Sequence, residues 1–182
     1  MGPRLELSLQ TATRNLTVPS VSAFRRWARA ATARPARVTV RVVNAAEGKK
    51  LNQDFRRRDY ATNVLTFVYG KDNGVLAGDL VLCAPVVARE AREQGKPVAA
   101  HYAHLLVHGM LHLQGYDHEE DGEAERMENR ERRILKSLGY ADPYAMPMDS
   151  ETKTTAAAAA GPRASKSTRK PASGGTTKKK SS

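Results

Sequence analysis

The sequence contains little of what would place a protein in an oxidising compartment or in a membrane. Cys83 is the only cysteine among 182 residues, which excludes a disulfide framework, and its position in an apolar run favours a buried small side chain over a reactive thiol. The longest uninterrupted apolar stretch, residues 80–88, is far shorter than the roughly 20 residues that a membrane helix needs. The first residues alternate polar and apolar side chains, whereas a signal peptide has a continuous apolar segment. We therefore expect a soluble cytoplasmic protein with no membrane partner.

Aromatic residues are also scarce, at 5% of the sequence, and none of the expected strands is rich in them. Proteins that bind single-stranded nucleic acid by stacking its bases use such side chains as platforms. If the protein binds nucleic acid, we therefore expect recognition through backbone charge and through delivery by partner proteins more than through the bases.

Acidic residues are outnumbered by basic ones, and the excess is unevenly distributed. The net charge is +11. Residues 1–116 carry 17 Lys and Arg against 8 Asp and Glu, residues 117–150 carry 5 against 10, and residues 151–182 carry 8 against 1. A basic body followed by a basic tail suggests a polyanionic partner, most simply a nucleic acid, although many basic proteins are only well solvated.

The composition changes near the C-terminal end. From residue 151 onward the chain consists mainly of Ala, Lys, Ser, Thr, Pro and Gly, with no aromatic residue, and such a segment cannot bury a core. We predict one domain over residues 1–148 and a disordered basic low-complexity tail over residues 149–182. The tail is either a loose electrostatic tether to RNA or the ribosome, or a solvated extension with no specific role.

The hydrophobic periodicity predicts an α+β fold. Alternating apolar residues indicate strands near residues 5–9 and 38–42, with a helix between them over residues 24–31. A helix is expected over residues 44–57, and then two strands over residues 63–69 and 78–83, joined by a turn-rich segment at residues 70–74. Three helices follow over residues 85–94, 97–113 and 119–138, each ended by a glycine. The expected architecture is a small mixed β-sheet of about four strands covered by about five helices.

The histidines are clustered, and this is the strongest functional signal in the sequence. His104, His108 and His112 follow one another at intervals of four residues, so they lie on one face of a helix. All three cannot bind one metal ion, because eight residues rise by roughly 12 Å along a helix while Zn–N bonds are only about 2.0–2.1 Å long. Two neighbours must chelate the ion, and a third ligand must come from elsewhere. We assign His101 and His104 to packing, to the helix surface or to supporting hydrogen bonds.

The third ligand is expected just beyond the end of this helix. Gly115 allows the chain to turn back and would bring His118 toward the pair formed by His108 and His112. The three histidines then form a closed set for one divalent metal ion, and we expect zinc from the choice of ligands. Three neutral imidazoles leave a fourth coordination position for water, which is typical of a catalytic and not of a structural zinc site.

The same histidine spacing occurs in the metzincin proteases, whose pattern is H-E-x-x-H-x-x-G-x-x-H. Gly109 stands where those proteases have the glutamate that serves as general base. A protease would therefore need a carboxylate from elsewhere, such as Asp79 or Glu90, to reach the water on the metal. Asp117, beside the third histidine, either orients an imidazole or caps the turn before the next helix.

The stretch HGMLHLQGYDH at residues 108–118 closely resembles the signature of the YbeY family of metal-dependent endoribonucleases and ribosomal RNA maturation factors. The likeness spans residues 37–146, with matching order and spacing. The other segments that carry it are LNQDFR at 51–56, Asp59, TNVLTF at 62–67, GDLV at 78–81, AAHYAH at 99–104 and LGYADPY at 138–144. Thr66 and Val68 depart from the family pattern, because serine and proline are common at these positions.

The resemblance implies one zinc ion held by His108, His112 and His118. It also implies cleavage of single-stranded RNA, with roles in 3′-end maturation of 16S ribosomal RNA and in ribosome quality control, and hence the small ribosomal subunit and its proteins as partners. One arginine, Arg56, is carried over as a catalytic residue. A guanidinium suits this role because it can bind two phosphate oxygens at once while charge builds on them. The two arginines that follow it are assigned to a solvated helix face.

The sequence does not identify a general base. Either water activated by the metal attacks the phosphodiester, or the 2′-hydroxyl of the RNA does, and only the second route leaves a cyclic 2′,3′-phosphate. Two other functions are open at this point. One is a non-catalytic ribosome-assembly factor whose metal only braces the loop after the helix, and the other is a metalloprotease. A fourth coordination position open to water would distinguish an enzyme from a structural site.

Overall fold

A four-stranded mixed sheet is the frame of the part of the chain that the computed structural model describes, residues 2–14, 17–116 and 121–145. The strand order is β1-β2-β4-β3. The first three strands in this order are parallel, and β3 is antiparallel to β4 and forms one edge of the sheet. The strands are β1 (Leu5–Thr11), β2 (Ala36–Val43), β3 (Val64–Asp72) and β4 (Val75–Cys83). The predicted mixed sheet of the α+β class is confirmed.

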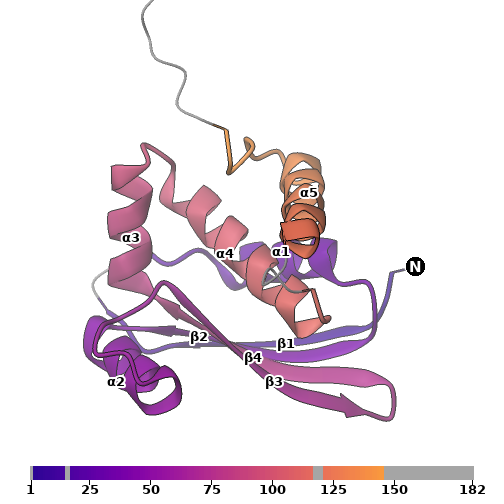
Figure 1. Ribbon diagram of the computed structural model, residues 1–182, viewed down its shortest axis with the longest axis horizontal. Coiled ribbons are helices and arrows are strands. Elements are labelled where there is room, and N and C mark those ends of the chain that lie inside the picture. The colour runs from indigo at the N-terminus through magenta and orange to yellow at the C-terminus, as the bar shows by residue number, and fades with distance from the viewer. Residues whose placement is uncertain (1, 15–16, 117–120, 146–182) are drawn as a thin grey trace, which may run out of the picture. The chain divides into compact units, whose positions relative to one another are not determined.

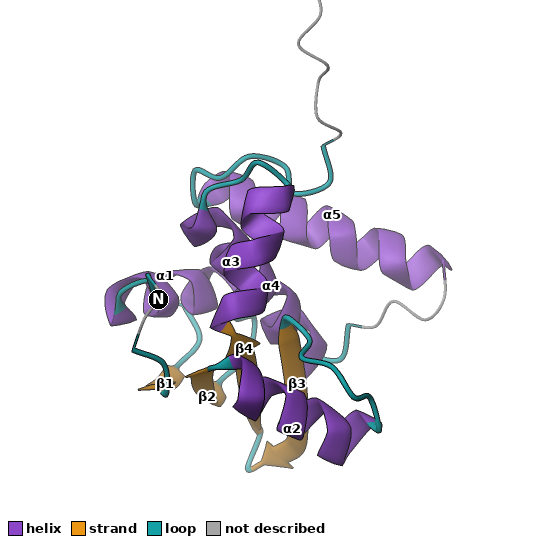
Figure 2. Cartoon of the chain, turned by 90° about the vertical axis from the view of Figure 1, so that its left-hand side faces the viewer, coloured by secondary structure: helices purple, strands orange, loops and turns teal. Residues whose placement is uncertain are grey.

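Five helices pack around this sheet within the described residues. They are α1 (Val21–Ala31), α2 (Ala45–Arg56), α3 (Ala84–Glu93), α4 (Val98–Leu113) and α5 (Asp121–Ser137). Helices α1, α4 and α5 lie on one side of the sheet, whereas α2 lies on the other side and covers only one end of it (Figure 1). The view turned by 90° also shows α3, α4 and α5 above the strands (Figure 2).

The two faces of the sheet have separate apolar clusters, and the alternation in β2 explains why. Val38, Val40 and Val42 point toward the larger cluster, which includes α4 and α1. On the opposite face, Val43 belongs to a smaller cluster together with Cys83, which is buried as expected for a small apolar side chain. Because successive side chains of a strand point to opposite faces, the residues of β3 are divided in the same way. This division places two different surfaces on either side of β3.

The helix boundaries follow the capping signals in the sequence. The side chain of Ser20 accepts a hydrogen bond from the backbone N–H of Ala23 at the start of α1, at 3.3 Å. Gly95, Gly115 and Gly139 follow α3, α4 and α5 with φ angles of 61°, 90° and 87°, a conformation that glycine adopts without strain. The three glycines that were predicted to end helices therefore do so.

The turn between β3 and β4 is shorter than predicted. Gly70 was expected to open a loop, but it lies within β3, where the register shifts between Val68 and Gly70. The turn itself is formed by Asn73 and Gly74, both with positive φ. An Asn-Gly pair favours a tight hairpin, and a glycine with φ of 97° tolerates the bulge, so the strand continues through a residue that usually interrupts strands.

Some predictions fall outside the described residues. The boundary after residue 148 and the disordered tail are among them, and so are His118 and Asp117. Within the described part, no helix is long and apolar enough to span a membrane.

Candidate active site

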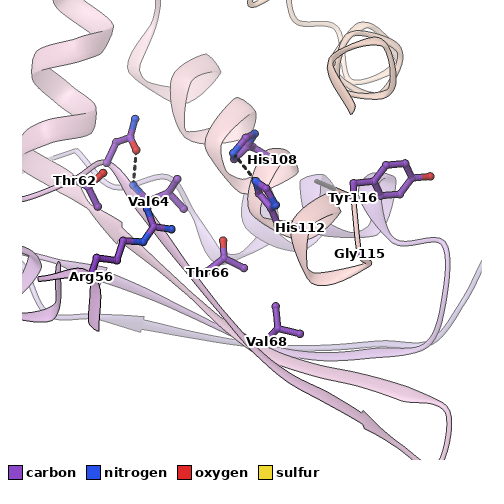
Figure 3. A pocket seen from close by; sticks show the side chains of 10 residues that line it. Arg56, Thr62, Val64, Thr66, Val68, His108, His112, Gly115 and Tyr116 are labelled. Carbon is purple, nitrogen blue, oxygen red and sulfur yellow. Dashed lines mark hydrogen bonds between the residues drawn. The ribbon is translucent and has the colours of Figure 1, made fainter. Parts of the chain in front are cut away.

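A cleft of about 570 Å³ lies between the C-terminal half of α4 and the edge strand β3 (Figure 3). It is lined by residues from three places: the end of α2, the inner face of β3 with the segment before it, and the end of α4. The lining residues are Arg56, Thr62, Asn63, Val64, Thr66, Val68, His108, His112, Gly115 and Tyr116. The cleft thus contains three of the four residues that were predicted as site residues.

His108 and His112 lie one helical turn apart on α4 and face the cleft together. Their Nε2 atoms are 3.1 Å apart, and their ring centroids are 4.6 Å apart (Figure 3). Two neighbouring histidines of this helix therefore lie close enough to bind one ion, and their role as metal ligands stays a prediction. Both rings present the same nitrogen to the same small space.

His108 is held in this orientation by Glu131 of α5. The Nδ1–H group of His108 donates a hydrogen bond to Oε1 of Glu131, at 2.8 Å, which leaves Nε2 directed toward the cleft. The side chain of Glu131 has 0% exposure. A carboxylate bound to one ring nitrogen fixes the tautomer of an imidazole and makes the other nitrogen a better metal ligand.

Glu131 accepts two further hydrogen bonds. His104 donates from Nε2 at 3.1 Å, and the hydroxyl of Tyr144 donates to the same carboxylate oxygen. Burial by itself raises the pKa of Glu131, but the hydrogen bonds from His104, His108 and Tyr144 outweigh it and lower this pKa to about 2. Glu131 is therefore a buried carboxylate that stays ionised at neutral pH.

His101 and His104 lie outside the cleft, as the sequence argument anticipated. His101 is 4% exposed and donates from Nε2 to Glu90, at 2.8 Å. Burial lowers the pKa of His101, and the neighbouring Glu90 only partly opposes this effect. Glu90 also accepts a hydrogen bond from Asn63 at 3.0 Å, so His101 supports the segment that leads into β3.

Arg56 is the last residue of α2, and its side chain extends into the cleft on the opposite side from the two histidines (Figure 3). The helix ends here because Arg57 adopts a left-handed conformation, with φ of 58°. The buried side chain of Asn52 donates a hydrogen bond to the carbonyl oxygen of Tyr60 at 2.7 Å, which fixes the loop after the helix. Arg56 therefore lies between helix α2 and a loop that is fixed by the hydrogen bond from Asn52.

Thr66 and Val68, the two departures from the family pattern, both line the cleft on the inner face of β3. Thr66 also lies close to α4, because a Cβ atom at Gly109 would be 3.3 Å from its hydroxyl oxygen. The two substitutions thus alter the wall of the cleft beside the histidines.

The position of Gly109 explains why a protease glutamate has no place in this helix. Gly109 is buried, and a Cβ atom there would approach Leu80 of β4 to 2.6 Å, so this position faces the sheet and not the cleft. Asp79 and Glu90, the two distant carboxylates considered for a protease, do not line the cleft. Asp79 accepts from Tyr69, and Glu90 accepts from His101. Neither carboxylate is available as a general base for the histidine pair.

Two residues of the site were missed by the sequence argument, Glu131 and Tyr144. Glu131 did leave a signal, because it lies at helical spacing on the same stripe as the buried residues Met127 and Leu135. An acidic residue on the apolar face of a helix has to find a partner when it is buried. The partner could not be identified without knowing that α5 packs against α4.

The third predicted metal ligand, His118, lies outside the described residues. Among the residues that the structure does describe, no group of three or more His, Cys, Asp or Glu side chains is arranged to hold a metal ion. The described part of the site therefore contains two of the three predicted ligands, together with the carboxylate that orients one of them.

The sequence of the chain matches one family of known proteins. The sequence pattern of the family described as Endoribonuclease YbeY matches residues 9–139. The chain belongs to the YbeY family. The endoribonuclease YbeY of Aromatoleum aromaticum is 59% identical over 145 residues, which cover 78% of this chain and 94% of the relative. The endoribonuclease YbeY of Methylibium petroleiphilum is 57% identical over 145 residues, covering 79% of this chain and 96% of the relative.

A solution structure of a Thermotoga maritima protein aligns with 77% of this chain and 99% of its own, with a TM-score of 0.46 and 24% identity.

The YbeY family is a family of endoribonucleases, so the resemblance seen in the sequence is confirmed, and with it the prediction of an enzyme that hydrolyses RNA. The roles of the individual histidines and of Arg56 stay predictions.

Proposed function

We propose that this chain is a metal-dependent endoribonuclease that cleaves single-stranded RNA in the cleft between α4 and β3. The observation that carries the proposal is the pair of Nε2 atoms of His108 and His112, 3.1 Å apart, in the same cleft as Arg56. Membership of the YbeY family supports RNA as the substrate. By the resemblance already described, we further propose that the substrate is the 3′ end of 16S ribosomal RNA in the context of the small subunit and ribosome quality control.

The histidine pair fits one zinc ion. Two imidazoles bound to a tetrahedral zinc with bonds of about 2.0–2.1 Å place their nitrogens about 3.3 Å apart, close to the 3.1 Å between the two Nε2 atoms. We propose His118 as the third ligand and zinc as the native ion. When bound, a divalent ion supplies positive charge for the phosphate oxygens and makes a water molecule more acidic.

Arg56 is proposed to hold the scissile phosphate. Its guanidinium enters the cleft from the end of α2, and it makes no ion pair with any residue that the structure describes, so its charge is available to a substrate. A guanidinium can donate two parallel hydrogen bonds to phosphate oxygens, which positions the phosphate and neutralises charge that develops on it. Glu131 contributes indirectly, because it keeps the His108 ring in one orientation.

The first experiment is cleavage of an end-labelled, unstructured fragment of ribosomal RNA by the purified full chain. The variants are His108→Ala and Arg56→Ala, and the control is Arg25→Ala, which removes an exposed arginine of α1 that does not line the cleft. Folding and zinc content are measured for each preparation. We expect the wild type and Arg25→Ala to cleave, His108→Ala to lose both zinc and cleavage, and Arg56→Ala to lose cleavage while it retains zinc.

Equal cleavage by all four preparations would show that the activity comes from a contaminant. If the wild type binds zinc tightly but cuts no RNA, the nuclease proposal fails and a non-catalytic assembly factor takes its place. The product ends separate the two routes of attack, because a cyclic 2′,3′-phosphate requires the 2′-hydroxyl as nucleophile.

A further inference from the structure

The exposed aromatic side chains of this protein are not scattered. Phe55, Tyr60 and Tyr69 are the exposed ones among the described residues, and all three lie in the segment from the end of α2 to β3. Phe55 is 64% exposed and Tyr69 is 66% exposed, although rings of this size are usually buried or half-buried in a soluble protein. This is the same segment that carries Arg56.

Phe55 and Tyr69 lie around one hollow on the outer face of β3, the face opposite α4. The hollow measures about 240 Å³, and Phe67 also lines it. Phe55 and Phe67 pack edge to face, with centroids 4.8 Å apart and planes at 72°. The remaining lining residues are Arg41, Glu47, Leu51, Asp79 and Val81. Three of the eight lining residues are aromatic, two are aliphatic and three are charged.

The charges around the hollow favour a nucleobase over a phosphate inside it. Glu47 and Asp79 are among its lining residues and would repel a phosphate. Glu47 pairs with Arg41, and Asp79 accepts a hydrogen bond from the hydroxyl of Tyr69. Directly after Phe55 come three consecutive arginines, residues 56–58, none of which forms an ion pair with a residue in the described ranges. An aromatic surface beside unpaired cations matches the two parts of a nucleotide.

We propose that this hollow binds one unstacked base of the single-stranded RNA whose phosphate lies in the cleft beside Arg56, an inference that rests on the proposed nuclease function. Phe55 and Arg56 are neighbours at the end of α2, but their side chains reach opposite faces of the edge strand β3. The ring of Phe55 lies on the outer face, and the guanidinium of Arg56 lies in the cleft. The RNA would pass around the edge of the sheet, with one phosphate held in the cleft and one base held in the hollow. The base stacks on the aromatic rings without sequence readout.

The test is equilibrium binding of a labelled, unstructured oligoribonucleotide to the full chain, measured by fluorescence anisotropy with the strand recovered intact afterwards. Phe55→Ala and Tyr69→Ala remove walls of the hollow. Tyr60→Ala is the matched control, because Tyr60 is 57% exposed but does not line the hollow. Phe55→Trp keeps a flat ring, and Phe55→Leu keeps only apolar surface. A second strand of equal length with abasic sites offers the phosphates without the bases.

We expect Phe55→Ala and Tyr69→Ala to weaken binding by about 5- to 150-fold, the range that base stacking contributes per base. Phe55→Leu should also weaken it, whereas Phe55→Trp and Tyr60→Ala should bind within about twofold of the wild type. The abasic strand should bind wild type and Phe55→Ala equally. Unchanged affinity in both alanine variants, or an equal loss for the abasic strand, would overturn the proposal and leave the hollow as a surface for a protein partner.

These outcomes are separable from failure of the nuclease proposal. If the wild type cleaves RNA but Phe55→Ala and Tyr69→Ala bind RNA as tightly as the wild type does, the proposed base site is wrong and the proposed active site stands. If the wild type neither binds nor cleaves RNA, the nuclease proposal itself fails, and the base site fails with it.

Discussion

Glu131 fixes the orientation of His108, one of the two histidines in the cleft. It has no exposed side-chain surface, it is ionised, and it holds Nδ1 of His108. We predict that Glu131→Gln weakens zinc binding by about 10- to 100-fold, because an amide is a poorer acceptor and no longer fixes the ring tautomer. The dissociation constant for zinc is measured by competition with a chelator, so the readout does not depend on RNA cleavage.

The control for this prediction is Glu128→Gln, one turn earlier on α5. Glu128 pairs with Arg132 at 3.3 Å, and its side chain is 41% exposed. Zinc affinity should be unaffected there. Equal zinc affinities in the two variants, with both folded, would show that Glu131 does not support the proposed metal site.

His101 makes stability depend on pH. Burial lowers its pKa, so the unfolded chain, with an ordinary pKa of about 6.5, binds a proton more readily than the folded chain. This contribution to stability is therefore present above about pH 6.5 and is lost as the pH falls below it toward the folded-state pKa. The charged and titratable groups that act on His101 are Glu90, His104 and Lys96.

We predict that His101→Gln reduces the loss of unfolding free energy between pH 7.5 and pH 5.5, even if the variant is less stable at both. Urea unfolding of wild type and variant at the two pH values gives the comparison. The quantity to compare is the change in unfolding free energy between the two pH values. The absolute stabilities are not compared, because the substitution also changes the contact with Glu90. A variant with the same pH dependence as the wild type would contradict the assignment.

At the scale of elements, the close approach of α4 to the sheet depends on small residues. A Cβ atom on Gly78 of β4 would lie 2.5 Å from the carbonyl oxygen of Phe67 and closer still to Leu113 of α4. Backbone cannot move aside as a side-chain end can. We predict that Gly78→Ala lowers the free energy of unfolding by about 1–3 kcal/mol, as overpacking does, and thermal or urea unfolding measures it.

Gly122→Ala is the matched control, because nothing lies within 4 Å of a Cβ atom at that position of α5. There the substitution should raise stability by up to about 1 kcal/mol through helix propensity. Destabilisation of similar size in both variants would show that the close packing at Gly78 is not the cause.

The elements predicted from the sequence were those with strong local signals. Periodicity gave the strands and helices, and Gly95, Gly115 and Gly139 gave three helix ends. The hollow on β3 was not anticipated, because Phe67 and Tyr69 are only two aromatic residues in their strand and the third ring, Phe55, comes from α2. The carboxylate of Glu131 was missed for the same reason. Contacts between elements that are distant in sequence have no local pattern from which they can be predicted.

At the scale of the whole molecule, the net charge of +11 can be read from the composition alone. Residues 151–182 carry +7 of the total of +11, yet every described residue that lines the cleft or the hollow lies between positions 41 and 116. We therefore predict two separate contributions to RNA binding. The body would supply the cleft and the proposed base site, and the basic segment would act by releasing counterions.

We predict that a chain ending after Ser150 still cleaves a single-stranded RNA, because none of the described site residues is removed. Its affinity should depend less steeply on salt, since each phosphate contact that is lost reduces the slope of log K against log salt by about 0.7 for single strands. Binding is measured for both chains across a salt series with the same RNA. A folded truncated chain without cleavage at low salt would place essential residues in the tail, and an identical slope would show that the tail contacts no phosphate.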